Sequence, residues 1–271
     1  MAEPIAFYFD FISPYAYLGS VGIMRVAEKH GRAVDWRPTL LGVSVLKVMG
    51  LKAVPDTPLK GAYFAHDWPR SARLMGIPHL PGAPVQFAPL PAARAFTHVK
   101  DRDAALAVRF GQAVFRAHWA EGRDMSSPGA VAEVAGECGI EPGEVLAAMS
   151  AESVKSRLRE HVHAALDAGV FGTPTFIVEG EMFWGADRLD QVDRWIATGG
   201  WWSSARSGRD SNLQICSTRR QTRPCLFRKR ASSTTTRSWR PVISSLSPAR
   251  ASTAKVTLRP STASTRAVAA T

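Results

Sequence analysis

The sequence predicts an α/β fold in which a long helical insertion divides a small sheet-forming unit. Three observations support this prediction. Residues 5–38 read as strand, helix and strand, residues 40–168 hold helix-period segments with Pro- and Gly-rich breaks, and strand-like sequence returns from residue 172. If the two outer parts share one sheet, the insertion has to bring them back together in space.

The first strand is expected over residues 5–11, where aromatic and branched residues form the short apolar run of a buried strand. Ser13 and Pro14 then supply a helix N-cap and a proline at the first helical position, and the helix is expected to end near His30. Residues 33–38 predict a second strand. A β-α-β unit of this kind has parallel strands and a right-handed crossover.

Ser13 stands where unsatisfied backbone N–H groups and the helix dipole favour an anion. Thioredoxin-like proteins place the first cysteine of Cys-x-x-Cys here, whereas this chain has Ser13-Pro14-Tyr15-Ala16. Without a thiol at either end, dithiol–disulfide exchange is excluded at this position. The serine hydroxyl could instead donate to a thiolate supplied by a ligand such as glutathione. The competing interpretation of a Ser-Pro pair is an ordinary helix start.

Residues 40–168 are expected to form a helical insertion without an internal repeat. Its clearest predicted helices cover about residues 101–120, 127–138, 141–149 and 151–168. Several apolar side chains in this part suit either a substrate pocket or an ordinary core. They are Phe64, Trp68, Phe87 and Trp119. The seven histidines are scattered and no metal-ligand cluster is present in the sequence, so no metal site is predicted.

The closing part predicts a strand through residue 178, a turn at Glu179 and Gly180, a second strand, and a helix that begins at Asp187. Thr173-Pro174 opens the first of these strands, although proline lacks the N–H of a ladder donor. We expect a cis-proline that faces the first helix, as in thioredoxin-like folds, with the preceding residue offering its backbone to an extended ligand. An ordinary trans proline is the alternative.

The net charge of +11 is concentrated in the C-terminal tail. Residues 201–271 hold 14 Lys and Arg and one acid, which leaves 20 basic and 22 acidic side chains in residues 1–200. The tail also has 24 Ser or Thr in 71 residues and no sustained apolar period. We therefore expect residues 202–271 to be disordered and not native to the fold, as an out-of-frame reading would give. A basic arm for nucleic acid or an acidic partner is the alternative.

The three cysteines are sparse, and no leader segment or long apolar run is present in the sequence. These features favour a soluble protein of the reduced cytoplasm with no membrane partner.

Taken in order, the motifs resemble those of the 2-hydroxychromene-2-carboxylate isomerases. This family belongs with the kappa-class glutathione transferases to the DsbA-like branch of the thioredoxin superfamily. The resemblance covers about residues 4–201. The matching segments are residues 9–17, 37–38, 40–42, 58–60 with Tyr63, Asp67 and Arg70, 169–174 and 184–189. It implies a thioredoxin-like domain from residues 1–39 and 169–201, and a helical insertion domain at 40–168.

The resemblance also implies a glutathione site. Ser13 matches the serine that stabilises the glutathione thiolate, and Thr173 before Pro174 matches the residue whose backbone pairs with the cysteinyl unit. The other implied cofactor-binding residues are Tyr15, Lys60, Asp187 and Arg188. Taken alone, Asp187 reads only as a helix N-cap and Lys60 as a solvated lysine. Two departures, at Ala186 and Leu51, replace polar side chains of the family pattern, so one or two cofactor contacts are expected to be missing.

The implied function is glutathione-dependent cis-trans isomerisation of 2-hydroxychromene-2-carboxylate or a related aromatic-degradation intermediate. The thiolate adds to the conjugated system, a bond rotates, and the thiolate leaves. The alternative is a kappa-like glutathione transferase or peroxidase acting on another electrophile. A third possibility is a non-catalytic binding module, or a protein directed to nucleic acid by its tail. Family members are usually dimers, so a homodimer that takes a small aromatic substrate is expected.

Overall fold

The computed structural model describes residues 2–82 and 87–201, so the expectation of a disordered tail falls outside the described residues. Four strands form one sheet in the order β2-β1-β3-β4. They are β1 (Ile5–Phe9), β2 (Val34–Pro38), β3 (Thr175–Val178) and β4 (Glu181–Trp184). As predicted, β1 and β2 are parallel, while β3 runs antiparallel to both β1 and β4. The first and last parts of the described chain therefore meet in the centre of the sheet.

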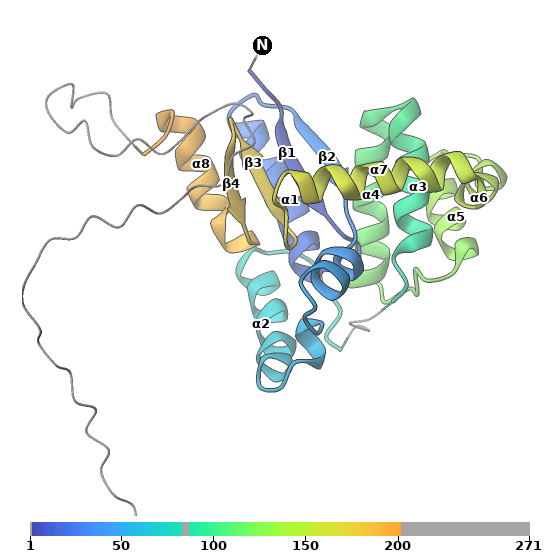
Figure 1. Cartoon of the computed structure of the whole chain (residues 1–271), viewed down its shortest axis with the longest axis horizontal. Coiled ribbons are helices and arrows are strands. Elements are labelled where there is room, and N and C mark those ends of the chain that lie inside the picture. The colour runs from blue at the N-terminus through green and yellow to red at the C-terminus, as the bar shows by residue number, and fades with distance from the viewer. Residues whose placement is uncertain (1, 83–86, 202–271) are drawn as a thin grey trace, which may run out of the picture. The chain divides into compact units, whose positions relative to one another are not determined.

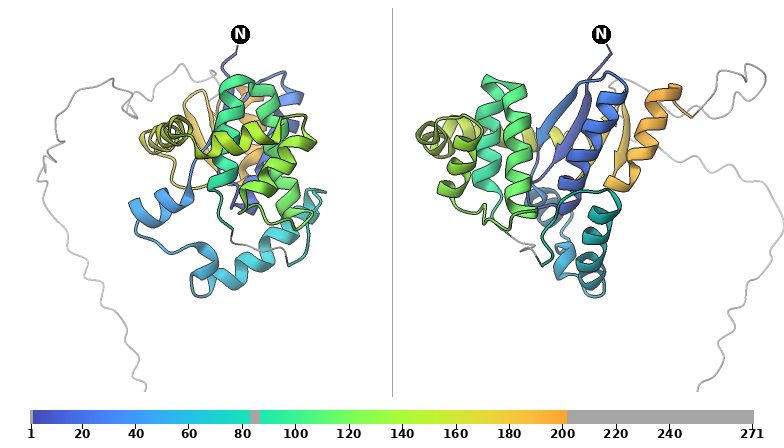
Figure 2. Two further views of the ribbon diagram at one scale, coloured as in Figure 1. Left: turned by 90° about the vertical axis from the view of Figure 1, so that its right-hand side faces the viewer. Right: turned by 180° about the vertical axis from the view of Figure 1, so that it is seen from behind.

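Helices cover both faces of this sheet. The α-helices are α1 (Pro14–Lys29), α2 (Lys60–Leu74), α3 (Leu90–Arg102), α4 (Ala104–Trp119), α5 (Pro128–Glu137), α6 (Pro142–Ser150), α7 (Glu152–Asp167) and α8 (Leu189–Thr198). Figures 1 and 2 show α1 and α8 on one face and α7 across the other, with α3 to α6 gathered beyond the β2 edge. Three shorter helical segments are η1 (Gly42–Val48), η2 (Val54–Asp56) and η3 (Ala186–Arg188).

Most of the predicted helices are confirmed to within a residue or two, but the helix expected over residues 101–120 is wrong at its start. α3 ends at Arg102 and α4 begins at Ala104. Asp103 between them has an extended backbone, and its carboxylate accepts the N–H of Leu106 at 2.9 Å. Asp103, which caps α4, therefore divides the segment that its hydrophobic pattern predicted to be one helix.

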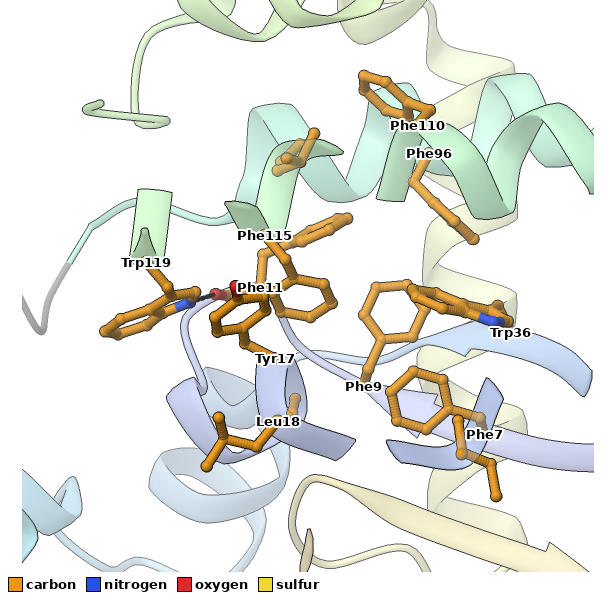
Figure 3. Close-up of a cluster of buried hydrophobic side chains, with 14 of the residues drawn as sticks. Phe7, Phe9, Phe11, Tyr17, Leu18, Trp36, Phe96, Phe110, Phe115 and Trp119 are labelled. Carbon is orange, nitrogen blue, oxygen red and sulfur yellow. Dashed lines mark hydrogen bonds between the residues drawn. The ribbon is translucent and has the colours of Figure 1, made fainter. Parts of the chain in front are cut away.

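An aromatic core joins the sheet to α3 and α4. Phe7 and Phe9 project from the same face of β1, because alternate residues of a strand share a face. The Phe9 ring lies 5.0 Å from that of Phe96 in α3, and the Phe11 ring lies 4.8 Å from that of Phe115 in α4 (Figure 3). Since the helical part shares its core with the sheet, burial of these rings fixes both together. The division into two domains stays a prediction.

The same core settles the two interpretations of the apolar helix residues. All four of those named above are buried members of this core, and the indole rings of Trp68 and Trp119 lie 5.3 Å apart. They are packing residues rather than an open pocket wall. In the part of the chain that the structure describes, no helix is long and apolar enough to cross a membrane.

Candidate functional site

Ser13 caps α1 and is also tied to the far end of the described chain. Its backbone is extended, and its Oγ accepts the N–H of Ala16 at 3.1 Å, which confirms the predicted N-cap. The hydroxyl donates to the carbonyl oxygen of Thr173 at 3.3 Å, across 160 residues of sequence. The side chain is 5% exposed. A long bond of this kind leaves the hydroxyl hydrogen available to a better acceptor.

The Thr173–Pro174 peptide is cis, as predicted, and Pro174 packs against α1. A Cβ at Gly19 would lie 2.8 Å from the Cβ of Pro174, so this close approach requires glycine. Among the described residues, neither the N–H nor the buried Oγ1 of Thr173 has a hydrogen-bond partner. Buried polar groups are normally paired, so these two groups suit a polar ligand. Such a ligand would lie along residues 168–174, between α7 and β3, which we call the cis-proline loop.

Asp187 and Arg188 lie beside this loop, in the short helix η3. The N–H of Gly185, just before η3, donates to the carbonyl oxygen of Pro174 at 2.9 Å. The side chains of Asp187 and Arg188 are 74% and 48% exposed, with 3.7 Å between the carboxylate and the guanidinium. The structure therefore brings the pair to the cis-proline loop and leaves both groups open to solvent.

The expectation that Asp187 begins the last helix as its N-cap is wrong. α8 starts at Leu189, its cap position is Arg188, and no side chain accepts a hydrogen bond there. The turn of 3-10 helix that precedes α8 places Asp187 one residue too early to cap it. The carboxylate of Asp187 therefore does not cap α8.

Tyr15 points away from Ser13 toward α2. Its phenol donates to the Oδ2 of Asp67 at 2.6 Å, and its ring packs against Phe64. Burial raises the pKa of Tyr15, and the hydrogen bond to Asp67 raises it further. The phenol proton is therefore held by Asp67, and the assignment of Tyr15 to cofactor binding stays a prediction.

Asp67 in turn pairs with Arg70, with 2.6 Å between the carboxylate and the guanidinium. Burial opposes ionisation of Asp67, but the hydrogen bonds from Tyr15 and Arg70 hold its pKa below the usual range. Arg70 also donates to the hydroxyl of Tyr63 at 2.8 Å. These residues were part of the matching motif without an assigned role. The sequence signal for their contact is the spacing of four residues from Tyr63 to Asp67 and of three from Asp67 to Arg70, which places all three on one face of a helix.

Lys60, by contrast, is not brought to Ser13 by any contact. It is the first residue of α2 and is exposed, and its ammonium group makes no hydrogen bond or ion pair within the described ranges. Its assignment to a cofactor or substrate carboxylate stays a prediction.

The sequence interpretation missed Asp10, three residues before Ser13. Its carboxylate accepts the N–H of Ile12 at 3.3 Å and the N–H of Leu41 at 2.7 Å, and the residue is 2% exposed. Burial raises the pKa of this carboxyl, and the surrounding N–H groups lower it only in part, which leaves it at about 6. The sequence signal for this residue is an acid placed between Phe9 and Phe11, at the end of an apolar strand where charged residues are rare.

Together these groups fit a peptide-like thiol. The α1 N-terminus and the Ser13 hydroxyl favour a thiolate, and the unpaired N–H and Oγ1 of Thr173 suit its peptide backbone. No cluster of three or more potential metal ligands occurs within residues 2–82 and 87–201.

Comparison with known proteins gives the same assignment of fold. Residues 4–197 match the DSBA-like thioredoxin domain. The chain belongs to this family. It is 29% identical over 192 residues to a 2-hydroxychromene-2-carboxylate isomerase of Pseudomonas putida, which covers 70% of this chain and 92% of that relative. It is 28% identical over 195 residues to glutathione S-transferase kappa 1 of Rattus norvegicus, covering 68% and 86% of the two chains.

A solved structure of 2-hydroxychromene-2-carboxylate isomerase is also similar to this DSBA-like protein. The two superpose with a TM-score of 0.64 at 26% sequence identity, over 72% of this chain and 95% of that chain. The first described part of the chain, the helical part and the closing strands are all within the matched range. The similarity to the family model therefore extends over residues 4–197 and includes both segments of the candidate site.

Proposed function

We propose that this DSBA-like protein is a glutathione-dependent cis-trans isomerase acting on 2-hydroxychromene-2-carboxylate or a related aromatic-degradation intermediate. The observation that carries the proposal is the hydrogen bond from Ser13 to Thr173, which joins a helix N-terminus to a cis-proline loop. Among the described residues, the N–H and Oγ1 of Thr173 in this loop have no hydrogen-bond partner. The similarity to the P. putida isomerase supports the reaction type. Within the proposal the enzyme acts in the cytoplasm as a homodimer.

Each residue has a defined role in this proposal. The Ser13 hydroxyl turns from Thr173 to donate to the glutathione sulfur, and the α1 N-terminus adds a favourable field for the negative charge. The Thr173 backbone, held by Pro174 against α1, pairs with the cysteinyl unit. Asp187 and Arg188 bind the γ-glutamyl end from the exposed edge of the loop.

When bound, glutathione would supply a thiolate that adds to the conjugated substrate, permits rotation about the former double bond, and then departs. The protein lowers the barrier by holding the sulfur in its charged form and by fixing the substrate beside it. Lys60 or Arg188 meets the carboxylate of the substrate, since both are exposed cations on the segments that flank the site.

Glutathione transfer or peroxide reduction is the second candidate, favoured by the similarity to the rat kappa-class enzyme. It uses the same groups to stabilise the thiolate, so the two functions differ only in the electrophile that is accepted. Turnover of a generic aromatic electrophile without isomerase activity would select this candidate.

The direct experiment follows the absorbance of 2-hydroxychromene-2-carboxylate with the full chain, with and without glutathione. We expect loss of the substrate signal only when glutathione is present. A separate calorimetric titration with glutathione tests the cofactor. Binding without turnover would retain glutathione and reject this substrate, whereas no binding would reject the cofactor assignment itself.

A further inference from the structure

Asp10 is a buried acid for which the proposed reaction has no use. It lies at the end of β1, and its hydrogen bonds within the described residues are made with backbone groups. The main-chain carbonyl accepts the Ser13 N–H at 3.0 Å, while the carboxylate accepts the N–H groups of Ile12 and Leu41. One residue thus ties the turn that carries Ser13 to the segment that follows β2.

The fold does not need this group to be charged. Burial is the largest influence on the carboxyl and disfavours the ionised form. No charged side chain compensates. The groups that favour ionisation are the backbone N–H groups of Phe11, Ile12 and Leu41, and no ionisable side chain from the elements packed around Asp10 contributes. Ionisation of Asp10 at neutral pH therefore lowers the stability of the fold.

The ionised form suits the task of holding the turn. A carboxylate accepts at both oxygens, and here the two oxygens serve different segments, with Oδ1 on Ile12 and Oδ2 on Leu41. A proton on either oxygen turns an acceptor into a donor that faces an N–H group. Other contacts hold the rest of the turn, since Trp119 donates from its indole to the Phe11 carbonyl at 3.1 Å (Figure 3).

We propose that Asp10 is a positioning residue whose carboxylate holds the Ser13 turn against the Leu41 segment, so that its protonation loosens the site. It does not touch the cofactor, and it acts through the position of Ser13. The ligand part of this inference rests on the proposed function. The structural part concerns the free protein alone.

The deciding experiment is an NMR titration of the full chain without ligand, from pH 5 to pH 8. We expect the Asp10 carboxyl carbon to titrate near pH 6, and the amide signals of Ile12, Ser13 and Leu41 to shift in the same transition. Asp10→Asn should abolish the transition, and Asp103→Asn, which alters another carboxylate bound to a backbone N–H, should leave it unchanged. Titration of the carboxyl without movement of these amides would overturn the proposal, and the wild-type titration decides this even if Asp10→Asn does not fold.

A second measurement follows the binding of S-methylglutathione, which has no thiol proton to titrate. We expect its affinity for the wild type to fall by about threefold to tenfold between pH 7.5 and pH 5, and to stay constant in Asp10→Asn. An equal fall in both proteins would reject the role of Asp10 in the site. Absence of binding at every pH would reject the glutathione assignment, while the ligand-free titration would still decide the positioning role.

Discussion

The candidate site has two parts that are built differently. The inner part consists of Ser13, Thr173 and Pro174, which are buried and held by hydrogen bonds and close packing against α1. The outer part consists of the exposed residues Asp187 and Arg188, which form an ion pair with each other, and of the exposed Lys60, whose place in the site stays a prediction. The inner part is fixed by the fold, whereas the outer part depends on side chains that solvent can reach.

This difference separates two properties of the enzyme. Stabilising a thiolate requires donors that do not move when charge develops, and buried backbone groups meet that requirement. Ligand specificity requires side chains that can be substituted without disturbing the fold, and the exposed charged residues of α2 and η3 meet this second requirement. We therefore expect substitutions in the inner part to change the rate and those in the outer part to change affinity.

The largest effect is expected for Ser13→Ala, which removes the donor to the sulfur. Loss of one such donor lowers turnover by about 10²- to 10³-fold. The apparent pKa of bound glutathione should rise, which thiolate absorbance at 240 nm measures. Loss of the α1 cap costs about 1 kcal/mol in addition.

Ser20→Ala is the matched control for this substitution. Ser20 is buried in the same helix, but its hydroxyl donates only to the Tyr17 carbonyl at 2.7 Å. It should leave both the rate and the thiolate titration unchanged. An unaltered titration in Ser13→Ala would remove Ser13 from the mechanism.

The next effect concerns the buried acid behind the inner part. Burial raises the pKa of Asp10 from its ordinary value of 3.8 to about 6, so the native state binds more protons than the unfolded state between these values. The free energy of unfolding should therefore fall as pH rises from about 4 to above 6, by up to about 3 kcal/mol. Urea unfolding at several pH values measures this fall.

The contribution of Asp10 is the difference between the wild type and Asp10→Asn, because other carboxylates titrate in the same range. The difference should be pH-dependent in this window. If the free energy of unfolding changes equally with pH in the two proteins, the buried carboxyl does not titrate near pH 6. That result would contradict the view that burial controls the groups of the inner part.

A smaller effect is expected for Gly19→Ala, which tests the packing of the cis-proline loop on α1. The new methyl group would lie 2.8 Å from the Cβ of Pro174, so the loop has to move. We expect a loss of about 1–3 kcal/mol in the free energy of unfolding, measured by urea titration, together with weaker glutathione binding. Gly42→Ala serves as the control, because nothing lies within 4 Å of its added Cβ. Equal stability of the two variants would argue against a tightly packed inner part.

The smallest effects should come from the outer part. Arg188→Gln should raise the dissociation constant for glutathione by about threefold to tenfold without changing the thiolate titration, since an exposed charge contact contributes little. Calorimetry at two salt concentrations measures it, with Arg157→Gln as the control, because Arg157 is an exposed arginine of α7 that pairs with Asp101 and Glu160. Lys60→Gln assigns the remaining cation. A change in substrate KM with unchanged glutathione affinity would place Lys60 at the substrate.

The parts of the site that depend on local chemistry can be predicted from the sequence. Ser13 and Pro14 begin α1 because a hydroxyl cap and a proline suit the first turn of any helix. Neither end of that turn is a cysteine, so the sequence alone excludes dithiol chemistry there. The order of strands and helices also followed from hydrophobic period, and the sheet joins both outer segments as expected.

Which of these groups lie together depends on tertiary packing. The contact of Ser13 with Thr173 spans 160 residues, and the turn of Tyr15 toward Asp67 spans 52. Local pattern cannot report such pairs, because they depend on how helices pack on the sheet. Packing likewise buries Asp10 and raises its pKa. It also places the four aromatic side chains of the helical part in the core, whereas the sequence pattern suited a core and a pocket wall equally.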